Sequence, residues 1–196
     1  MRKVNHELIF PFAKEELEDA IKLLDEDLKK LGTLGKSTGA RIAEGSWVYG
    51  DKIHLVNRFK QVNSAITGLP IENQEIPHFI KYEVGGKYSP HFDFFKEGTE
   101  YYEKCVSRGG QRVFSTILYL NDNFQGGETH FPKLDLTIKP IAGKVFCWRN
   151  VNEDGSLNKE SLHAANPIIS GVKYIIIIWT RERKFFSSGN KKIFEK

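Results

Sequence analysis

Short segments rich in β-branched and aromatic residues fill residues 78–181 and constrain the fold more than any other feature. Turn-forming residues, mainly Gly, Asn and Asp, separate them. Because no helical pattern comes between the segments, a parallel sheet built from βαβ units is excluded, and we expect an antiparallel sandwich or barrel. The segments are HFIKYEV, SPHFDFF, RVFSTILYL, ETHFP, LDLTI, KVFCW and VKYIIIIWTR.

Two amphipathic patterns precede these segments. In the first, large apolar residues recur at steps of three and four, which predicts a helix over 14–31 that ends at Gly32. The second predicts a helix that the turn at 68–70 stops. The apolar residues are Leu17, Ile21, Leu24, Leu28 and Leu31 in the first helix and Leu55, Phe59, Val62 and Ile66 in the second.

The fold class expected is therefore mainly β with N-terminal helices (α+β). A length of 196 residues suits one domain, with a helical support region over 1–70 and a β core over 78–181. The net charge of +4 is small and spread along the chain, so we expect no binding to nucleic acid.

Nothing in the sequence points to a membrane or to secretion. The longest apolar run, at 174–179, is far too short to cross a bilayer, and the N-terminus has no apolar run of signal-peptide length. Cys105 and Cys147 are not spaced as a metal-binding pair, and we expect two reduced thiols rather than a disulfide. These features indicate a cytoplasmic protein.

His91 and Asp93 are the first candidate metal ligands. Alternate side chains of a strand share one face, so both would point inward and offer a nitrogen and an oxygen to the same point. A histidine from a distant strand would complete the two-histidine, one-carboxylate ligation of non-haem iron(II) oxygenases, which leaves three metal positions open. Taken alone, H-x-D is a weak signal, and the alternative is a solvated pair near a turn.

Five other histidines compete for the distal ligand position. His130 lies between Thr129 and Phe131, so it faces outward if those two face the core. His163 is followed ten residues later by a lysine. The remaining three are His6 in the N-terminal segment, His54 on the second helix and His78 at a strand start.

Lys173 decides between these candidates. It begins a strand in which two isoleucines and Trp179 share its face, so its ammonium group should be buried. A buried ammonium needs a partner, because desolvating an unpaired charge costs several kcal/mol. The structural alternative is a carboxylate such as Glu128, and the functional one is the distal carboxylate of an acid bound to the metal. The order of H-x-D, distal histidine and lysine favours the functional partner, with His163 as third ligand.

These motifs stand within four longer stretches, KYEVGGKYSPHFDFF, GGQRVFSTILYLNDNFQGGETHFP, LTIKPIAGKVFCW and NEDGSLNKESLHAANPIISGVKYIIIIW. The stretches closely resemble the catalytic domain of prolyl 4-hydroxylases, which are Fe(II)/2-oxoglutarate-dependent dioxygenases. The resemblance covers residues 40–181 and includes VNRFKQVNSAITGLPIENQE, which looks like the helix before that family's core. It implies a double-stranded β-helix (jelly roll) backed by N-terminal helices.

The resemblance implies a role for four residues at the reacting centre. The family's Fe(II) ligands fall on His91, Asp93 and His163. Its anchor for the C5 carboxylate of 2-oxoglutarate falls on Lys173. The implied reaction consumes dioxygen, converts 2-oxoglutarate to succinate and carbon dioxide, and hydroxylates a C–H bond, with ascorbate as reductant. It needs no general base, so we expect no catalytic residue beyond the metal centre.

Further positions match through the same resemblance. Tyr82 matches a tyrosine that hydrogen-bonds the cosubstrate. Tyr119 and Thr129 match polar positions near the same anion, with satisfied polar groups of the core as the alternative. Trp179 is expected to pack under the site, and Gly126–Gly127 to form a tight turn.

On the substrate side the match is less complete. Arg41, Glu75 and Arg112 match positions that face a peptide, which implies a proline-containing peptide or protein as substrate. The family's peptide-binding loop usually reads Arg-Thr-Ser, whereas residues 41–43 are Arg-Ile-Ala, and a histidine is common where this chain has Arg181. The alternative for each of these four charges is plain surface charge.

Three functions therefore stay open. The first is a prolyl hydroxylase acting on peptides, similar to procollagen-proline 4-dioxygenase, and the second is the same chemistry on a free amino acid or another side chain. The third is a jelly-roll binding module without turnover, which has no need of both the ligand set and Lys173. The polar segment 96–108 is either a lid over the substrate or a solvated loop.

Overall fold

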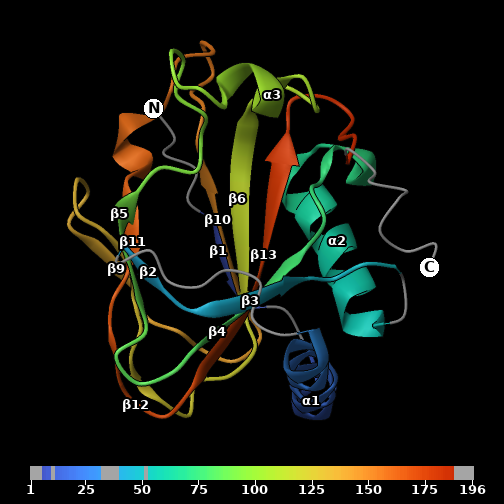
Figure 1. The fold of residues 1–196 in the computed structure, drawn as a ribbon, viewed down its shortest axis with the longest axis vertical. Coiled ribbons are helices and arrows are strands. Elements are labelled where there is room, and N and C mark those ends of the chain that lie inside the picture. Colours follow the sequence, from blue (N-terminus) through green and yellow to red (C-terminus); the bar gives the residue numbers. More distant parts are fainter. Residues whose placement is uncertain (1–5, 10–11, 32–39, 51–52, 188–196) are drawn as a thin grey trace.

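A computed structural model describes residues 6–9, 12–31, 40–50 and 53–187 of the chain. Two antiparallel sheets face each other, and α1 and α2 cover the outer side of the larger one (Figure 1). The helices are α1 (Lys14–Leu31), α2 (His54–Thr67) and the short α3 (Tyr102–Val106), with single 3₁₀ turns at Ile71–Asn73 and Lys159–Ser161.

The larger sheet has six strands, and its two central strands are also its longest. In spatial order the strands are β1 (His6–Ile9), β10 (Lys144–Arg149), β6 (Arg112–Tyr119), β13 (Lys173–Arg181), β4 (His78–Tyr82) and β3 (Glu44–Trp47).

The smaller sheet has five short strands and carries the histidines of the candidate site. They are β2 (Arg41–Ile42), β5 (Lys87–His91), β11 (His163–Ala165), β8 (Thr129–Phe131) and β9 (Leu136–Ile138). A separate two-stranded ladder joins β12 (Ile168–Ser170) to β7 (Gln125–Gly126).

Both predicted helices are confirmed, with α1 covering the predicted residues. Leu17, Leu24 and Leu28 of α1 are buried against the larger sheet, and each such burial stabilises the fold by about 1.5–3 kcal/mol. α2 ends at Gly68, whose φ of 70° is a left-handed conformation that glycine adopts without steric cost. The predicted end of α1 at Gly32 lies outside the described residues.

A buried polar contact fixes α2 over the centre of the larger sheet. The amide of Asn63 donates to Thr180 Oγ1 at 2.9 Å and accepts from Thr116 Oγ1 at 2.6 Å. Because all three side chains are buried, these hydrogen bonds satisfy groups that would otherwise be costly to desolvate. They set the helix against β6 and β13, the strands whose opposite faces line the site.

β13 is buried on both faces. Lys173, Ile175, Ile177 and Trp179 point between the two sheets, as predicted, and the alternate residues Ile176, Ile178 and Thr180 pack toward the helices. A second apolar cluster fills the space between the sheets, and the candidate site opens within it. In the part of the chain that the structure describes, no helix is long and apolar enough to cross a lipid bilayer.

Several local features differ from expectation. β5 ends at His91, so Asp93 lies in a bend just past the strand rather than within it. The N-terminal segment contributes β1, which pairs with β10, and His163 lies on a strand that was not predicted. The other short strands missing from the prediction, β7 and β12, pair only with each other.

Candidate metal centre and cosubstrate pocket

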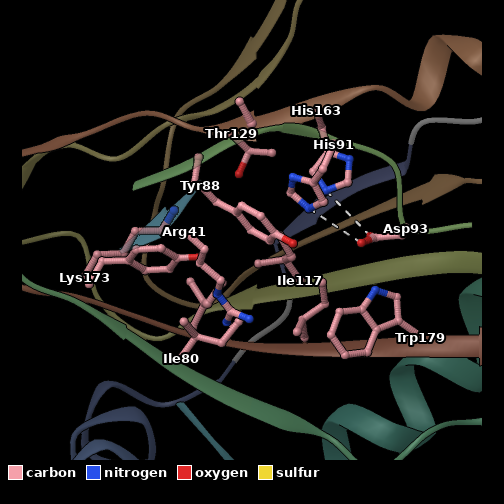
Figure 2. Close-up of a pocket in the computed structure, with 15 residues that line it drawn as sticks. Arg41, Ile80, Tyr88, His91, Asp93, Ile117, Thr129, His163, Lys173 and Trp179 are labelled. Atoms are coloured by element: carbon pink, nitrogen blue, oxygen red, sulfur yellow. Dashed lines mark ion pairs between the residues drawn. The ribbon is translucent and has the colours of Figure 1, made fainter. Parts of the chain in front are cut away.

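Three side chains, two on neighbouring strands of the smaller sheet and one just past a strand end, meet at one point between the sheets. His163 on β11 lies opposite His91 on β5, and Asp93 turns back toward both from the bend after β5 (Figure 2). Each of the three offers one ligand atom, and these atoms all lie within 4.8 Å of one another. Among the described residues this is the one such cluster of three or more metal-ligating side chains.

Backbone carbonyls orient both imidazole rings. His91 Nδ1 lies 2.9 Å from Ser89 O, and His163 Nδ1 lies 2.9 Å from Ser161 O. A carbonyl only accepts hydrogen bonds, so each Nδ1 carries the hydrogen and each Nε2 keeps its lone pair. Both Nε2 atoms face Asp93, at 3.7 Å from Oδ1 for His91 and 3.6 Å from Oδ2 for His163.

The electrostatics of the cluster suit a cation. Burial and the neighbouring His163 lower the pKa of His91 to about 4, so its ring is neutral at pH 7. Burial alone would raise the pKa of Asp93, but His163, His91 and Arg112 outweigh it and hold that pKa at about 2. The Nε2 atoms of the two imidazoles and a buried carboxylate thus face one point, and this donor set fits a divalent iron.

Lys173 lies at the opposite end of the same pocket from Asp93 (Figure 2). Only 1% of its surface is exposed, and Nζ donates to Gly127 O at 2.6 Å. Burial lowers its pKa to about 7, and the Glu128 carboxylate opposes this shift without reversing it. Among the described contacts no ion pair joins the two, since Glu128 accepts from Asn166 instead. The lysine is therefore a buried amine that lines the pocket and has no ion pair among the described contacts.

Polar groups surround the lysine end of the pocket. The rings of Tyr82 and Tyr119 lie 5.3 and 5.5 Å from Lys173 Nζ. Tyr119 Oη and Thr129 Oγ1 are 2.7 Å apart and share a hydrogen bond. Thr129 also lines the pocket, whereas His130, next to it, faces outward toward Thr137, as predicted. The pocket thus has three candidate metal ligands at one end and a buried lysine among polar groups at the other.

The comparison with protein families decides what this arrangement is. Residues 77–181, from the start of β4 through the end of β13, match the model of the 2OG-Fe(II) oxygenase superfamily. The chain belongs to this superfamily. The 2OG-Fe(II) oxygenase match contains the three clustered ligands, Lys173 and the polar residues around it.

A relative that matches most of the chain is a prolyl hydroxylase by name. The chain is 29% identical over 202 residues to prolyl 4-hydroxylase subunit alpha-2 of Gallus gallus, covering 91% of this chain. It spans only 37% of the length of that subunit.

Solved structures of prolyl hydroxylases share the fold. The 2OG complex of the viral collagen prolyl hydroxylase from Paramecium Bursaria Chlorella virus-1 superposes with a TM-score of 0.74 at 23% identity, covering 92% of this chain and 97% of that one. A Trichoplax adhaerens prolyl hydroxylase in complex with a hypoxia inducible factor oxygen degradation domain peptide fragment gives 0.64 at 16% identity, with coverages of 92% and 84%. The predicted jelly-roll core is thereby confirmed.

In this member of the superfamily, Glu75, Arg112 and Arg181 form an ionic network beside the clustered ligands, with Arg112 half-buried and the other two buried. Glu75 accepts from Arg112 at 2.6 and 2.8 Å and from Arg181 at 2.5 Å. Arg181 also donates to Cys105 O and Gly110 O, which ties it to the C-terminal end of α3 and to the turn that follows. Glu75 is 5% and Arg181 2% exposed, so the surface-charge alternative is wrong for both. Contact with a substrate stays a prediction for all three.

Arg112 connects this network to the pocket. Its guanidinium carbon lies 3.9 Å from the centroid of the Trp179 ring, and Trp179 lines the pocket. On the other side of the pocket, Arg41 from β2 lies 5.2 Å from the ring of Tyr88 and is itself a lining residue. The four charges predicted to face a substrate thus fall into one buried group and one separate arginine.

Tyr88 is a lining residue that the sequence did not predict. Its ring stacks on His91 with centroids 3.6 Å apart. Strict alternation would place residues three apart on opposite faces, but Tyr88 and His91 pair with Ala165 and His163, only two residues apart on β11. The extra residue on β5 is a bulge next to Pro90, and it turns both rings into the pocket. The proline directly before the H-x-D motif was the one feature of the sequence that could have indicated this irregularity.

Proposed function

We propose that this protein is an Fe(II)- and 2-oxoglutarate-dependent dioxygenase that hydroxylates proline within a peptide or protein and releases succinate and carbon dioxide. The observation that carries the proposal is the placement of the His91–Asp93–His163 cluster and the buried Lys173 at opposite ends of one pocket. Membership of the 2OG-Fe(II) oxygenase superfamily gives this geometry its chemistry.

The assigned roles follow from position. His91, Asp93 and His163 would hold Fe(II), and Lys173 would pair with the far carboxylate of 2-oxoglutarate. Bound iron and 2-oxoglutarate would supply the oxidising chemistry with dioxygen as cosubstrate and ascorbate as reductant. Tyr82, Tyr119 and Thr129 surround the lysine and are suited to hydrogen-bond the same carboxylate. No side chain is assigned as general base.

The chain's own contribution is to orient ligands and to exclude water. Between the metal ligands and the lysine the pocket wall is apolar, formed by Ile80, Ile117, Ile175 and Ile177. Such a wall keeps the effective dielectric low, which strengthens the pairing of Lys173 with a carboxylate. It also protects a strongly oxidising centre from side reactions with solvent.

The proposed substrate region lies on the Trp179 side of the pocket. Trp179, His78 and Trp47 form an aromatic series toward the surface, with His78 stacked on Trp47 at 4.5 Å and Trp47 37% exposed. Proline-rich segments dock on such aromatic surfaces at low entropic cost, because they are already extended. The names of the relatives, which are prolyl hydroxylases, support proline as the target.

Charge around this region indicates a preference in the substrate. Glu75 neutralises only one of the two arginines that it contacts, and Arg41 adds a further positive charge at the pocket. We therefore assign Arg41, Arg112 and the Glu75–Arg181 pair to substrate recognition. Arg41 and Arg112 would contact the substrate, and Arg181 would hold Glu75 in place. Peptides with acidic residues beside the proline complement this charge.

Release of succinate from 2-oxoglutarate tests the proposal. Purified protein with Fe(II) and ascorbate is incubated with proline-rich peptides and, in parallel, with free amino acids including proline. The proposal is supported if succinate release depends on iron and is stimulated by the peptides but by none of the free amino acids. Stimulation by a free amino acid would redirect it to a different substrate class, and the absence of any iron-dependent succinate would reject the dioxygenase assignment.

A further inference from the structure

Ser115 and Asn150 form a buried hydrogen-bonded chain that ends on Asp93. Ser115 Oγ donates to Asp93 Oδ2 at 2.6 Å, and Asn150 Nδ2 donates to Ser115 Oγ at 2.8 Å. Ser115 lies on β6 and Asn150 directly after β10, and neither has any exposed surface. The three residues are far apart in sequence, and the pairing of β10 with β6 brings the serine and the asparagine together.

The direction of this chain follows from its chemistry. An ionised carboxylate only accepts hydrogen bonds, so the single hydroxyl hydrogen of Ser115 must point to Asp93. The serine oxygen can then only accept a hydrogen bond from Asn150. The asparagine must therefore direct its NH₂ group, and not its carbonyl oxygen, at the serine. Asn150 Oδ1 is buried without a partner among the described residues, so the side-chain amide uses its donor toward Ser115 and leaves its acceptor unsatisfied.

Backbone contacts hold the far end of the chain rigidly. Asn150 N donates to Val113 O at 2.8 Å, and Asn158 N donates to Asn150 O at 2.9 Å. Ser115 lies in the middle of the larger sheet, paired with Trp148 on one side and Trp179 on the other. These contacts fix the backbone positions from which both donor side chains project.

The consequence is that the two oxygens of Asp93 differ. Oδ2 accepts the hydrogen bond from Ser115 and lies 3.6 Å from His163 Nε2, whereas Oδ1 lies 3.7 Å from His91 Nε2 and receives no hydrogen bond from Ser115. The two histidines are held in the same manner, each through the ring nitrogen that points away from the cluster. Outer hydrogen bonds of this kind orient metal ligands and tune their affinity.

We infer that Ser115 and Asn150 are positioning residues that hold Asp93 as a one-oxygen ligand and so keep metal positions open for the cosubstrate and dioxygen. The inference rests on the proposed function and adds to it two residues outside the ligand set. Asn150 acts through Ser115, because its amide reaches the serine and not the carboxylate.

The test is Fe(II) affinity measured by anaerobic titration without cosubstrate or peptide. Ser115→Ala should raise the Kd for Fe(II) about 10–100-fold, and Ser115→Thr, which keeps the hydroxyl, should restore most of the affinity. Asn150→Ala should raise the Kd less, and the double variant should be no worse than Ser115→Ala alone, since one residue acts through the other. The absorption spectrum of the Co(II)-substituted Ser115→Ala variant should also differ from wild type, as the carboxylate is free to rotate.

Thr116→Val is the matched control. Thr116 is the next residue on β6, equally buried, and its hydroxyl bonds Asn63 on the other face of the sheet. It should lose stability but keep the wild-type Kd. A wild-type Kd in Ser115→Ala, or an equal loss in Thr116→Val, would overturn the inference while leaving the proposed function intact. If Ser115→Ala does not fold, the Kd of Asn150→Ala for Fe(II) tests the inference in its place: a raised Kd supports it and a wild-type Kd overturns it. Failure of the wild-type protein to bind Fe(II) would instead reject the proposed function itself.

Discussion

His163 lies directly opposite His91 in the antiparallel pairing of β11 with β5. Although 72 residues separate them in sequence, the pairing brings their rings to 4.2 Å between centroids. The irregular pairing around Pro90 brings in Tyr88 from β5, and the bend after His91 brings in Asp93. The cluster thus depends on the register of two short strands and on the bend that follows one of them.

Replacing any one ligand should remove metal-dependent turnover. His91→Ala, Asp93→Ala and His163→Ala should each abolish tight Fe(II) binding, because two remaining ligands cannot hold the ion against water. The fold should survive, since the apolar cores form without the metal. Fe(II) titration and circular dichroism check both points. His130→Ala is the control, and loss of iron binding there with retention in His163→Ala would show the ligand assignment to be wrong.

Lys173→Ala should act on the cosubstrate. The far carboxylate of 2-oxoglutarate would lie in a buried pocket with no cation, a loss of about 3–5 kcal/mol, or roughly two to four orders of magnitude in KM for 2-oxoglutarate. Lys173→Arg should also bind poorly, because the planar guanidinium differs in shape from an ammonium group. Iron affinity measured alone should stay at the wild-type value. An unchanged KM for 2-oxoglutarate would remove the lysine from the cosubstrate site.

The affinity for 2-oxoglutarate should fall at alkaline pH. Burial lowers the pKa of Lys173 to about 7 in the free protein, and only its ammonium form pairs with a carboxylate. Below pH 7 the lysine is already charged, so the affinity is flat. Above pH 7 binding must first take up a proton, and the Kd should rise up to about tenfold per pH unit. Calorimetry between pH 6 and 9 measures this, and Lys173→Met should abolish the dependence.

Arg112→Ala should separate substrate binding from cosubstrate turnover. The KM for peptide should rise, and the preference for acidic residues beside proline should weaken, because a positive charge at the pocket is lost. Decarboxylation of 2-oxoglutarate without peptide should continue near the wild-type rate. Arg58→Ala, which removes an ion-paired arginine on α2, is the control for general effects. A parallel fall of both activities in Arg112→Ala would place this residue with the cosubstrate instead.

Much of this arrangement could be predicted from local patterns. The apolar spacing of α1 and α2 is a property of each helix alone, and the alternation along β13 placed Lys173 inside correctly. What could not be predicted depends on partners distant in sequence. β11 is three residues long and gains its strand character from β5 and β8, and β1 gains its own from β10.

The residues on the substrate side could not be predicted for the same reason, because their contacts join positions distant in sequence. Glu75, Arg112 and Arg181 stand at three separate places in the sequence, where each is indistinguishable from a surface charge. Only the pairing of β6 with β13 and the approach of Glu75 to Trp179 O bring them together and bury them. Ser115 and Asn150 were missed for the same reason, because a serine within a strand carries no signal of the carboxylate opposite it.

Mass spectrometry of reacted peptides tests the central claim most directly. A proline-rich peptide with acidic flanking residues is incubated with the protein, Fe(II), 2-oxoglutarate and ascorbate in air, and fragment ions locate any added oxygen. The account predicts a gain of one oxygen on proline, matched by one succinate per modified peptide and absent from the Asp93→Ala variant. A gain on lysine or another side chain with every proline unmodified would contradict the prolyl assignment, and iron-independent modification would contradict the whole account.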